Sequence, residues 1–549
     1  MPNYGSRHCL KAAQARVSIG AMIDRLRHLL RNPLFLVGLT ACLAAMVVQS
    51  GELGTSDTTH RLATTHSFWT SDPPVDPRDY PEFGIHGRNG RLYAWYGIGQ
   101  SLLMLPADVV GTYVENLSIF DAYHVDPTPR SMIVSYSTNT IVCVLVILVC
   151  FRFLRQLGFS INQRIAGALA LLFCTTFLHY TQNMTENNYI LLLTLTGLSF
   201  HYEWLGTGSR RALLIGSGAL GLNLLTRLTT GMDLLAVTLF DFLALRSKGR
   251  SRGESHERFV EYAKVALPVY LVFFVLDRVY QYARFGSFFN TYTQIFGREQ
   301  KILNPELPAA FPFETPFHIG FFGALFKPEK SIFLFDPLLA LTVLLVARAW
   351  KQFQPEIRAY LIAFTALMLA YIGFYARYTD WSGDFAWGDR YVSTPVEIVA
   401  FLSVPLLMRH RADVGQAAWR WGLALTGASV VVQLASVMFW CPLEIYQMET
   451  LGHPTFVIAL RLKNIAAFAL GKMDQWGLNN DAMKEDPWDY VHITTYNFLP
   501  FLLARVGKAP GWLVDLLTAL WSTLLGALLI LLGFIRRRAK RGEWEPATL

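Results

Sequence analysis

Residues 31–71 read RNPLFLVGLTACLAAMVVQSGELGTSDTTHRLATTHSFWTS, an apolar run followed directly by a polar segment. Residues 33–50 contain no charged side chain, which predicts a helix that crosses a membrane. The polar segment places Asp57, His60 and Arg61 three and four residues apart, so a helix would carry them on one face. We therefore expect an acidic side chain at the membrane surface, at the depth of the lipid head groups.

The composition of the whole chain is that of a multi-span membrane protein. Of its 549 residues, 53% are hydrophobic and only 16% are charged, and the mean hydropathy is +0.32. Apolar runs of about 20 residues recur along the chain and predict an all-α membrane protein with about twelve transmembrane helices. They lie near 33–50, 131–151, 163–180, 188–205, 211–227, 229–245, 262–282, 331–347, 358–377, 391–408, 420–440 and 512–535.

Basic side chains gather in alternate loops and at both ends of the chain. Because cytoplasmic loops of membrane proteins are enriched in Lys and Arg, we expect both termini in the cytoplasm. The N-terminal basic residues before the first span predict a retained signal anchor. The net charge of +8 is therefore read as a topology signal, and nucleic-acid binding is not expected.

These patterns divide the chain into four parts. Residues 1–32 form a cytoplasmic segment, and 33–440 form a transmembrane catalytic module whose outer loop, 51–130, carries interfacial helices. Residues 441–511 form an outer-face loop, and 512–549 hold the last transmembrane helix and a basic cytoplasmic tail. Within the outer loop, segment 95–117 is apolar but carries polar residues, which favours a helix that lies in the interface.

Asp57 is the first candidate for chemistry. A carboxylate at the start of a surface helix can accept a proton from an acceptor hydroxyl as a general base. The alternative is a helix-capping role, which Ser56 and Asp57 both favour. His60 and Arg61 are expected to orient Asp57 or to contact the substrate.

Glu186 is the second candidate, in the short outer loop HYTQNMTENNY between two predicted spans. So short a loop keeps Glu186 near the membrane surface, where we expect it to lie close to Asp57. Asp57 and Glu186 would then share an acceptor or a divalent metal ion such as Mg²⁺ or Mn²⁺, which prefer oxygen ligands. The alternative is an acid that stabilises the start of a helix.

Lys327, Lys330 and Arg390 break the cytoplasmic bias of the basic residues, because they fall on the outer side or at its border. Cations there would bind the phosphate of a lipid-linked substrate and offset charge on the leaving group. The alternative is local ion pairing, with Glu329 between the lysines and Asp389 beside Arg390.

Four further strings are informative: GRNGRLYAWYGIGQSLLMLPADVVG at 87–111, RFGSFFNTYT at 284–293, FGALFKPEKSIFLFDPLL at 322–339 and DFAWGDRYVSTP at 384–395. They resemble membrane-embedded glycosyltransferases of the GT-C superfamily, which include protein O-mannosyltransferases and the aminoarabinose transferase of lipid A. The family's first-loop acid falls on Asp57 and its second-loop acid on Glu186. The resemblance implies a polyprenyl-phosphate-linked sugar as donor. The chain differs from the protein mannosyltransferases in having one acid where they place a pair.

The sequence therefore predicts a glycosyltransferase of the bacterial inner membrane with its active site facing outward. It would transfer a hexosyl or pentosyl group from the polyprenyl phosphate to a lipid, glycan or protein acceptor. The alternative is a transporter or flippase of a polar-headed lipid or a lipid-linked sugar. Repeated halves, which are common in transporters, are not evident in the sequence.

Overall fold

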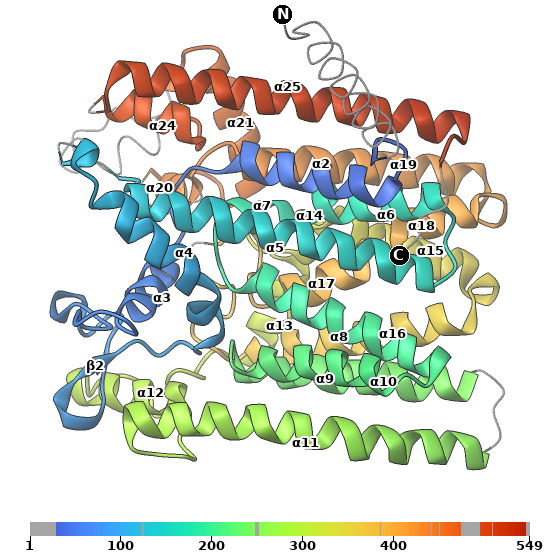
Figure 1. The fold of residues 1–549 in the computed structure, drawn as a ribbon, viewed down its shortest axis with the longest axis horizontal. Coiled ribbons are helices and arrows are strands. Elements are labelled where there is room, and N and C mark those ends of the chain that lie inside the picture. Colours follow the sequence, from blue (N-terminus) through green and yellow to red (C-terminus); the bar gives the residue numbers. More distant parts are fainter. Residues whose placement is uncertain are drawn as a thin grey trace, which may run out of the picture.

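The computed structural model describes residues 29–121, 123, 126–247, 252–384, 386–440, 442–449, 451–473, 495–507 and 509–544. Long helices run side by side along one direction, and shorter elements gather at one end of the bundle (Figure 1). The predicted cytoplasmic segment 1–32 lies almost entirely outside the described residues, as does a large part of 441–511.

Helices make up most of the described chain. Its helices are α2 (Pro33–Val48), α3 (Ser56–His66), α4 (Gly99–Glu115), α5 (Pro129–Gln156), α6 (Ile161–Cys174), α7 (Phe177–Gln182), α8 (Asn187–Thr207), α9 (Arg210–Leu224), α10 (Gly231–Ser247), α11 (Arg252–Phe285), α12 (Tyr292–Leu303), α13 (Phe317–Phe326), α14 (Ile332–Phe335), α15 (Pro337–Ala349), α16 (Pro355–Tyr375), α17 (Ser393–Ala400), α18 (Ser403–Arg409), α19 (Arg411–Ser436), α20 (Pro442–Glu449), α21 (Val457–Ala469), α24 (Leu499–Val506) and α25 (Gly511–Arg541). A two-stranded antiparallel hairpin, β1 (Ile85–His86) and β2 (Leu92–Tyr93), is the sheet of the described part.

The predicted class, an all-α membrane protein, is confirmed. Within the described residues, five helices are long and apolar enough to cross a membrane: Pro129–Gln156, Leu228–Arg246, His256–Phe285, Pro355–Tyr375 and Gly511–Arg541. Every predicted span coincides with helix, but three of them are divided, into α6 and α7, α14 and α15, and α17 and α18. The count of twelve transmembrane helices stays a prediction.

The core lies where apolar faces of neighbouring helices meet. Helix α2 packs against α5 and α25, α8 packs against α9, and α10 packs against α16. Small side chains allow close approach, as with Ala41 and Ala44 of α2, which are buried together with Val146 and Ile147 of α5. Helices α11 and α25 are mostly exposed along their apolar windows, as expected for helices that face lipid.

One end of the bundle carries the polar elements that matter for function. Helices α3, α4 and α12 and the hairpin lie together there, on the left of the view (Figure 1). Helix α4 is the segment that the sequence predicts as interfacial, and it packs against α3 and α5. Asp108 of α4 is buried and accepts hydrogen bonds from Trp69 Nε1 at 2.8 Å and Arg130 Nε at 2.6 Å. These contacts fix α4 to the elements on either side of it.

Candidate active site

A cavity of about 1650 Å³ opens at this end of the bundle. Its lining combines ionisable side chains, among them Asp57, Arg61, Glu186, Arg227 and Arg390, with a wall of aromatic rings. The aromatic residues of that wall include Tyr292, Phe296, Phe311, Phe313, Phe374, Tyr375, Tyr378 and Tyr391. Cavities that bind small molecules are mostly apolar and hold a few convergent polar groups, which is the composition seen here.

Helix α3 begins beside the loop between α7 and α8. Thr55 caps it by accepting a hydrogen bond from the Thr58 amide at 3.3 Å, and Asp57 lies in the first turn. Gly54, at φ +82°, permits the close approach, because a Cβ there would lie 2.5 Å from Asn183 Cα. The Thr58 hydroxyl donates to the Met184 carbonyl across the same contact. These contacts bring Asp57 and Glu186 to one cavity although 129 residues separate them in the sequence.

Tyr96 reaches the same point from the segment before α4. Its backbone path is close to the end of α9, since a Cβ on Gly97 would lie 2.3 Å from the Thr226 carbonyl oxygen. The Tyr96 hydroxyl donates to Asp57 Oδ1 at 2.6 Å. Burial and the nearby Asp57 raise the pKa of Tyr96 well above its usual value, so the hydroxyl stays protonated and able to donate.

Asp57 has a second partner, Arg390, whose Nη1 lies 3.0 Å from Asp57 Oδ2. Burial by itself would raise the pKa of the Asp57 carboxyl. The opposite charges of Arg390 and Arg61 and the Tyr96 hydrogen bond outweigh burial and hold that pKa at about 2. Asp57 is therefore ionised throughout the neutral range, and in this arrangement it is a weak base.

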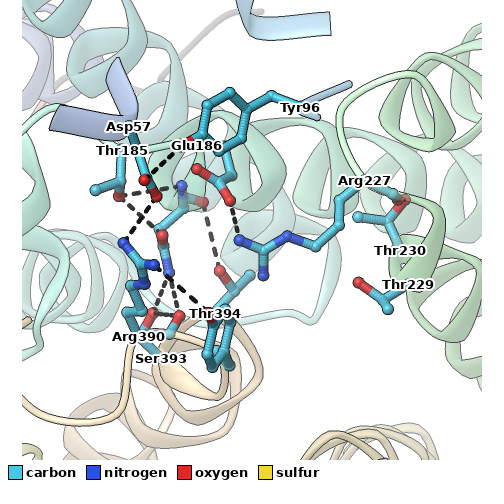
Figure 2. Close-up of polar contacts among 12 residues, drawn as sticks. Asp57, Tyr96, Thr185, Glu186, Arg227, Thr229, Thr230, Arg390, Ser393 and Thr394 are labelled. Carbon is cyan, nitrogen blue, oxygen red and sulfur yellow. Dashed lines mark hydrogen bonds and ion pairs between the residues drawn. The ribbon is translucent and has the colours of Figure 1, made fainter. Parts of the chain in front are cut away.

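Glu186 is held by two arginines. Arg61 Nη2 lies 2.7 Å from Glu186 Oε2, and Arg227 pairs with Oε1 of the same carboxylate. The Arg61 guanidinium also stacks over the Tyr96 ring, 4.1 Å from its centroid. Figure 2 shows Arg390 beside Asp57 and Arg227 beside Glu186, with the four side chains coming from separate elements. With three arginines against two carboxylates, the group carries an excess of one positive charge.

The loop before α17 delivers Arg390. The Asn187 side chain donates to the Arg390 carbonyl oxygen at 2.5 Å and to Ser393 Oγ at 2.6 Å. Thr185 orients Asn187 by donating to its Oδ1 at 2.8 Å (Figure 2). The residues on both sides of Glu186 therefore hold the backbone that carries Arg390, so the two halves of the site are built as one unit.

His60 of α3 is not among the residues that line the cavity. Its ring stacks on Phe83 at a centroid distance of 4.2 Å, and its Nδ1 is 3.8 Å from Asp79 Oδ2. Burial lowers the pKa of His60, which favours the neutral imidazole. The substrate contact expected for His60 stays a prediction. In the structure its contacts with Phe83 and Asp79 link α3 to the loop that follows it.

Lys327 and Lys330 are not among the residues that line the cavity. Lys327 is exposed, and its Nζ lies 5.5 Å from the centroid of the Trp381 ring. Lys330 is buried, and its Nζ donates to three backbone carbonyls of the loop that carries Arg390. Of the three cations predicted to bind phosphate, Arg390 is the one that the structure brings to the cavity. Direct phosphate contact by the two lysines stays a prediction.

The predicted divalent ion would need Asp57 and Glu186 as ligands. Both carboxylates are paired with guanidinium groups, and the described residues contain no group of three or more His, Cys, Asp or Glu side chains placed to hold a metal. This donor set does not make a metal site, and we derive no step through a metal ion. Dependence of activity on a divalent ion stays a prediction, which chelation with EDTA tests directly.

The sequence did not single out Tyr96 or Tyr391, and it gave Arg227 no role in catalysis. Arg227 carries a usable signal, because a charged residue at the edge of an apolar helix is costly unless it faces a partner or a cavity. The Tyr391 ring lies 5.3 Å from the guanidinium carbons of both Arg227 and Arg390. No local pattern marks a tyrosine for such a place, since its partners come from distant segments.

No protein-family model and no curated protein matches this sequence. Among solved structures, the chain is similar to the apo oligosaccharyltransferase of Archaeoglobus fulgidus, with 13% identity and a TM-score of 0.43, over 74% of this chain and 56% of that chain. Oligosaccharyltransferase AglB of the same organism, in complex with an inhibitory peptide and a dolichol-phosphate, gives 13% identity and a TM-score of 0.41, over 74% and 55%. ArnT from Cupriavidus metallidurans, bound to undecaprenyl phosphate, gives 14% and 0.40, over 77% and 73%.

Two of these neighbours are oligosaccharyltransferases by name, and the third is bound to undecaprenyl phosphate. The chain spans about half of the length of the oligosaccharyltransferases that it matches. Matches with scores this low do not show which residues correspond between two chains, and they do not show a shared activity.

Proposed function

We propose that this protein is a membrane glycosyltransferase that moves a sugar from a polyprenyl-phosphate-linked donor to a hydroxyl of a lipid, glycan or protein acceptor. The observation that carries the proposal is the pairing of Asp57 with Arg390 at the edge of a large, partly aromatic cavity. It places a carboxylate that can accept a proton beside a cation that can bind a phosphate. The predicted topology puts this reaction on the outer face of the membrane.

The phosphate of the donor would bind at the arginines. Among the described residues, Arg390 Nε and Arg61 Nη1 are buried nitrogen atoms without a hydrogen-bond partner. Each such donor carries a desolvation cost that a bound anion would relieve. A phosphate there would gain charge-assisted hydrogen bonds, and the excess positive charge of the group would stabilise it as a leaving group.

Binding of the phosphate would also change Asp57. Arg390 is the strongest of the cations that lower the pKa of Asp57. A phosphate that shares the Arg390 guanidinium weakens that ion pair, so the carboxylate becomes a stronger base when the donor is present. A base matched more closely to the working pH transfers a proton more efficiently.

The transfer would be a single nucleophilic displacement at the anomeric carbon of the sugar. Asp57 takes the proton of the acceptor hydroxyl, and the acceptor oxygen forms a bond to the anomeric carbon of the sugar. The bond between that carbon and the phosphate oxygen breaks, and polyprenyl phosphate leaves with the electron pair. The product is expected to have the opposite anomeric configuration to the donor, because the attack comes from the face away from the leaving group.

The aromatic wall of the cavity suits the remaining part of such a donor. Tyr375 and Tyr391 stack at a centroid distance of 4.3 Å beside the arginines. Aromatic faces bind apolar chains and the apolar faces of sugars. Nearby, helix α13 exposes Phe317, Phe322 and Phe326, which are side chains that a membrane would cover. The cavity therefore offers a polar end for phosphate and sugar and an apolar side toward the lipid chain.

The test begins by identifying the donor. Lipid-linked sugars are profiled in cells that have the protein, lack it, or carry Asp57→Asn. We expect one polyprenyl-phosphate sugar to accumulate in the last two strains. The purified wild-type protein should then transfer that sugar from the isolated donor and release polyprenyl phosphate. Unchanged profiles in all three strains would reject the proposal.

The same isolated donor lipid and purified protein distinguish the transferase from the alternative, a transporter or flippase. A transporter moves the intact lipid across vesicles and releases no polyprenyl phosphate. Transfer of radiolabelled sugar in detergent solution, where no compartments exist, supports the transferase. Movement of the intact lipid in vesicles, unaffected by Asp57→Asn, supports the alternative.

A further inference from the structure

The side chain of Lys330 occupies the inside of the loop that precedes α17. Lys330 is 8% exposed, and its Nζ donates to the carbonyl oxygens of Asp384 at 2.5 Å, Ala386 at 2.8 Å and Gly388 at 3.3 Å. An ammonium group has three N–H donors, so these three carbonyls match its full capacity. The ammonium group therefore links three backbone carbonyls of one loop.

The backbone of this loop is coiled tightly around the ammonium group. Gly383 and Gly388 have φ values of +77° and +70°. Asp384, at φ +55°, is the non-glycine residue with a positive φ in the described part of the chain. Left-handed backbone is unfavourable for a residue with a side chain, and it persists only where surrounding contacts enforce it. The Lys330 hydrogen bond to the Asp384 carbonyl is one such contact.

The far side of the loop is anchored on the protein core. Trp387 is 1% exposed, and its ring contacts Phe335 edge-on at a centroid distance of 5.0 Å. The Tyr180 hydroxyl donates to the Trp387 carbonyl at 3.3 Å. These contacts hold one residue of the loop, whereas Lys330 ties together carbonyls on both sides of it.

Arg390 follows directly and depends on this conformation. A Cβ on Gly383 would lie 2.4 Å from Arg390 Cγ, so the start of the loop packs against the stem of the arginine. The guanidinium at the end of that stem meets Asp57 at 3.0 Å. A displacement of the loop moves the stem of Arg390 and, with it, the guanidinium that faces the cavity.

We propose that Lys330 is a positioning residue that acts through Arg390: by binding three carbonyls of the loop 384–388 it sets the guanidinium of Arg390 against Asp57 and toward the donor phosphate. The proposal rests on the proposed function for the identity of the ligand, and on the carbonyl contacts for the mechanism. It assigns to Lys330 an indirect part in phosphate binding, in place of a direct contact.

The test compares wild type with Lys330→Met, Arg390→Gln and the double variant, each purified in detergent. Lys330→Met keeps the apolar stem and removes the donors. Two quantities are measured: amide hydrogen exchange of the peptide that covers 383–392, and the Kd for undecaprenyl phosphate as probe. Lys472→Met, which alters an exposed lysine far from the loop in sequence, is the matched control and should behave as wild type.

We expect Lys330→Met to raise exchange in the loop peptide and to weaken undecaprenyl phosphate binding by about ten-fold, as for loss of one charge-assisted contact. The double variant should bind no more weakly than Arg390→Gln alone, because Lys330 acts through that arginine. If Lys330→Met does not fold, Lys330→Gln, which keeps two donors, should give the same pattern with smaller changes.

Two outcomes overturn the proposal. If the Kd of the double variant rises by the product of the two single fold-changes, Lys330 contacts the phosphate independently of Arg390. Unchanged loop exchange in Lys330→Met would show that the carbonyl contacts do not hold the loop. If wild type does not bind undecaprenyl phosphate, the proposed function is contradicted, while the exchange measurement still tests the role of Lys330 in the loop.

Discussion

Two arginine–carboxylate groups are buried at the same end of this protein, and they differ in one respect. Arg461 of α21 donates to both oxygens of Glu444 at 2.6 Å and also to the carbonyls at the end of α19, and both side chains are fully buried. At the cavity, Arg390 and Arg61 also pair with carboxylates, but Arg390 Nε and Arg61 Nη1 have no partner among the described residues.

The difference separates a structural group from a candidate binding site. The Glu444–Arg461 group is saturated, since Asn464 Nδ2 also donates to Glu444 Oε1 at 2.9 Å. It links α20 and α21 to the end of α19 and has no free capacity. The cavity group keeps donors that are already desolvated and that belong to side chains lining the cavity. Donors of this kind bind an anion without first giving up another partner.

The largest effect is expected for Asp57→Asn. Loss of a general base typically costs about a hundred- to ten-thousand-fold in turnover. Tyr96 and Arg390 donate to different oxygens of Asp57. In the Asn variant the amide oxygen can accept from Arg390, and the NH2 group can donate to the Tyr96 hydroxyl, so the protein should still fold, as checked by size-exclusion chromatography and thermal unfolding. Glu52→Gln, at another acid that lines the cavity, is the matched control. Near-full turnover by a folded Asp57→Asn enzyme would remove Asp57 from the chemistry.

Substitutions in the Glu444–Arg461 group should lower the free energy of unfolding. Glu444→Gln leaves the Arg461 charge buried without its counter-ion, which typically costs about 3–5 kcal/mol of unfolding free energy. We expect a large fall in thermal midpoint and loss of folded protein in detergent. Replacing both residues, as Glu444→Leu with Arg461→Met, should recover part of the loss, because no unpaired charge remains. A Glu444→Gln protein as stable as wild type would contradict the comparison.

Arg390→Gln should weaken phosphate binding strongly and lower folding stability only a little. The substitution removes one charge-assisted contact to the phosphate, worth about 1.5–3 kcal/mol, so the Kd for undecaprenyl phosphate should rise about 10- to 100-fold. The loss of folding stability should be smaller than for Glu444→Gln, because the cavity admits water to the freed Asp57. Isothermal titration and thermal unfolding on the same samples measure both effects. Equal stability losses in the two variants would mean that both groups are structural.

The smallest expected effect is a pH dependence of stability. The pKa of Asp57 falls from its ordinary 3.8 to about 2 in the folded protein. Because the pKa is lower in the folded protein, the ionised carboxylate stabilises the fold by about 2 kcal/mol at any pH above the unfolded-state pKa. This stabilisation is lost as the pH falls from about 4 to about 2. The difference in unfolding free energy between wild type and Asp57→Asn should therefore be constant from pH 5 to 8 and shrink below pH 4. A difference that persists unchanged to pH 2 would contradict the assigned ion pair.

Local sequence patterns predicted much of the architecture and part of the site. Apolar runs located helices, and the spacing of Asp57, His60 and Arg61 was expected to place them on one face of a helix. Of these three residues, Asp57 and Arg61 line the cavity, and His60 is not among its lining residues. These features depend on neighbours within one turn of helix, which a sequence displays directly. The helix breaks within 163–180, at Thr175 and Thr176, and within 391–408, at Phe401 and Leu402, were not predicted, because apolar residues continue on both sides of them.

The partners of the charged residues were harder to predict. The sequence suggested local pairing of Arg390 with Asp389, but the Arg390 guanidinium pairs with Asp57, 333 residues away. The sequence suggested a phosphate contact for Lys330, which stays a prediction; the structure adds carbonyl contacts of its ammonium group with a loop more than 50 residues further along. Close approaches at Gly54 and Gly97 bring the neighbouring Asp57 and Tyr96 to the cavity, and such approaches depend on the paths of whole segments through the fold.

The sequence by itself determined that this protein is a helical membrane protein and that an acid begins a polar helix after the first apolar run. Hydrophobicity and helical spacing are properties of neighbouring residues, so they need no fold to be read. Only the tertiary structure decided which cations meet Asp57 and Glu186. It also decided that Arg461 is saturated, while Arg390 Nε has no hydrogen-bond partner within the part of the chain that the structure describes. Ion pairing depends on distances of a few ångströms between segments hundreds of residues apart, and helix packing alone sets those distances.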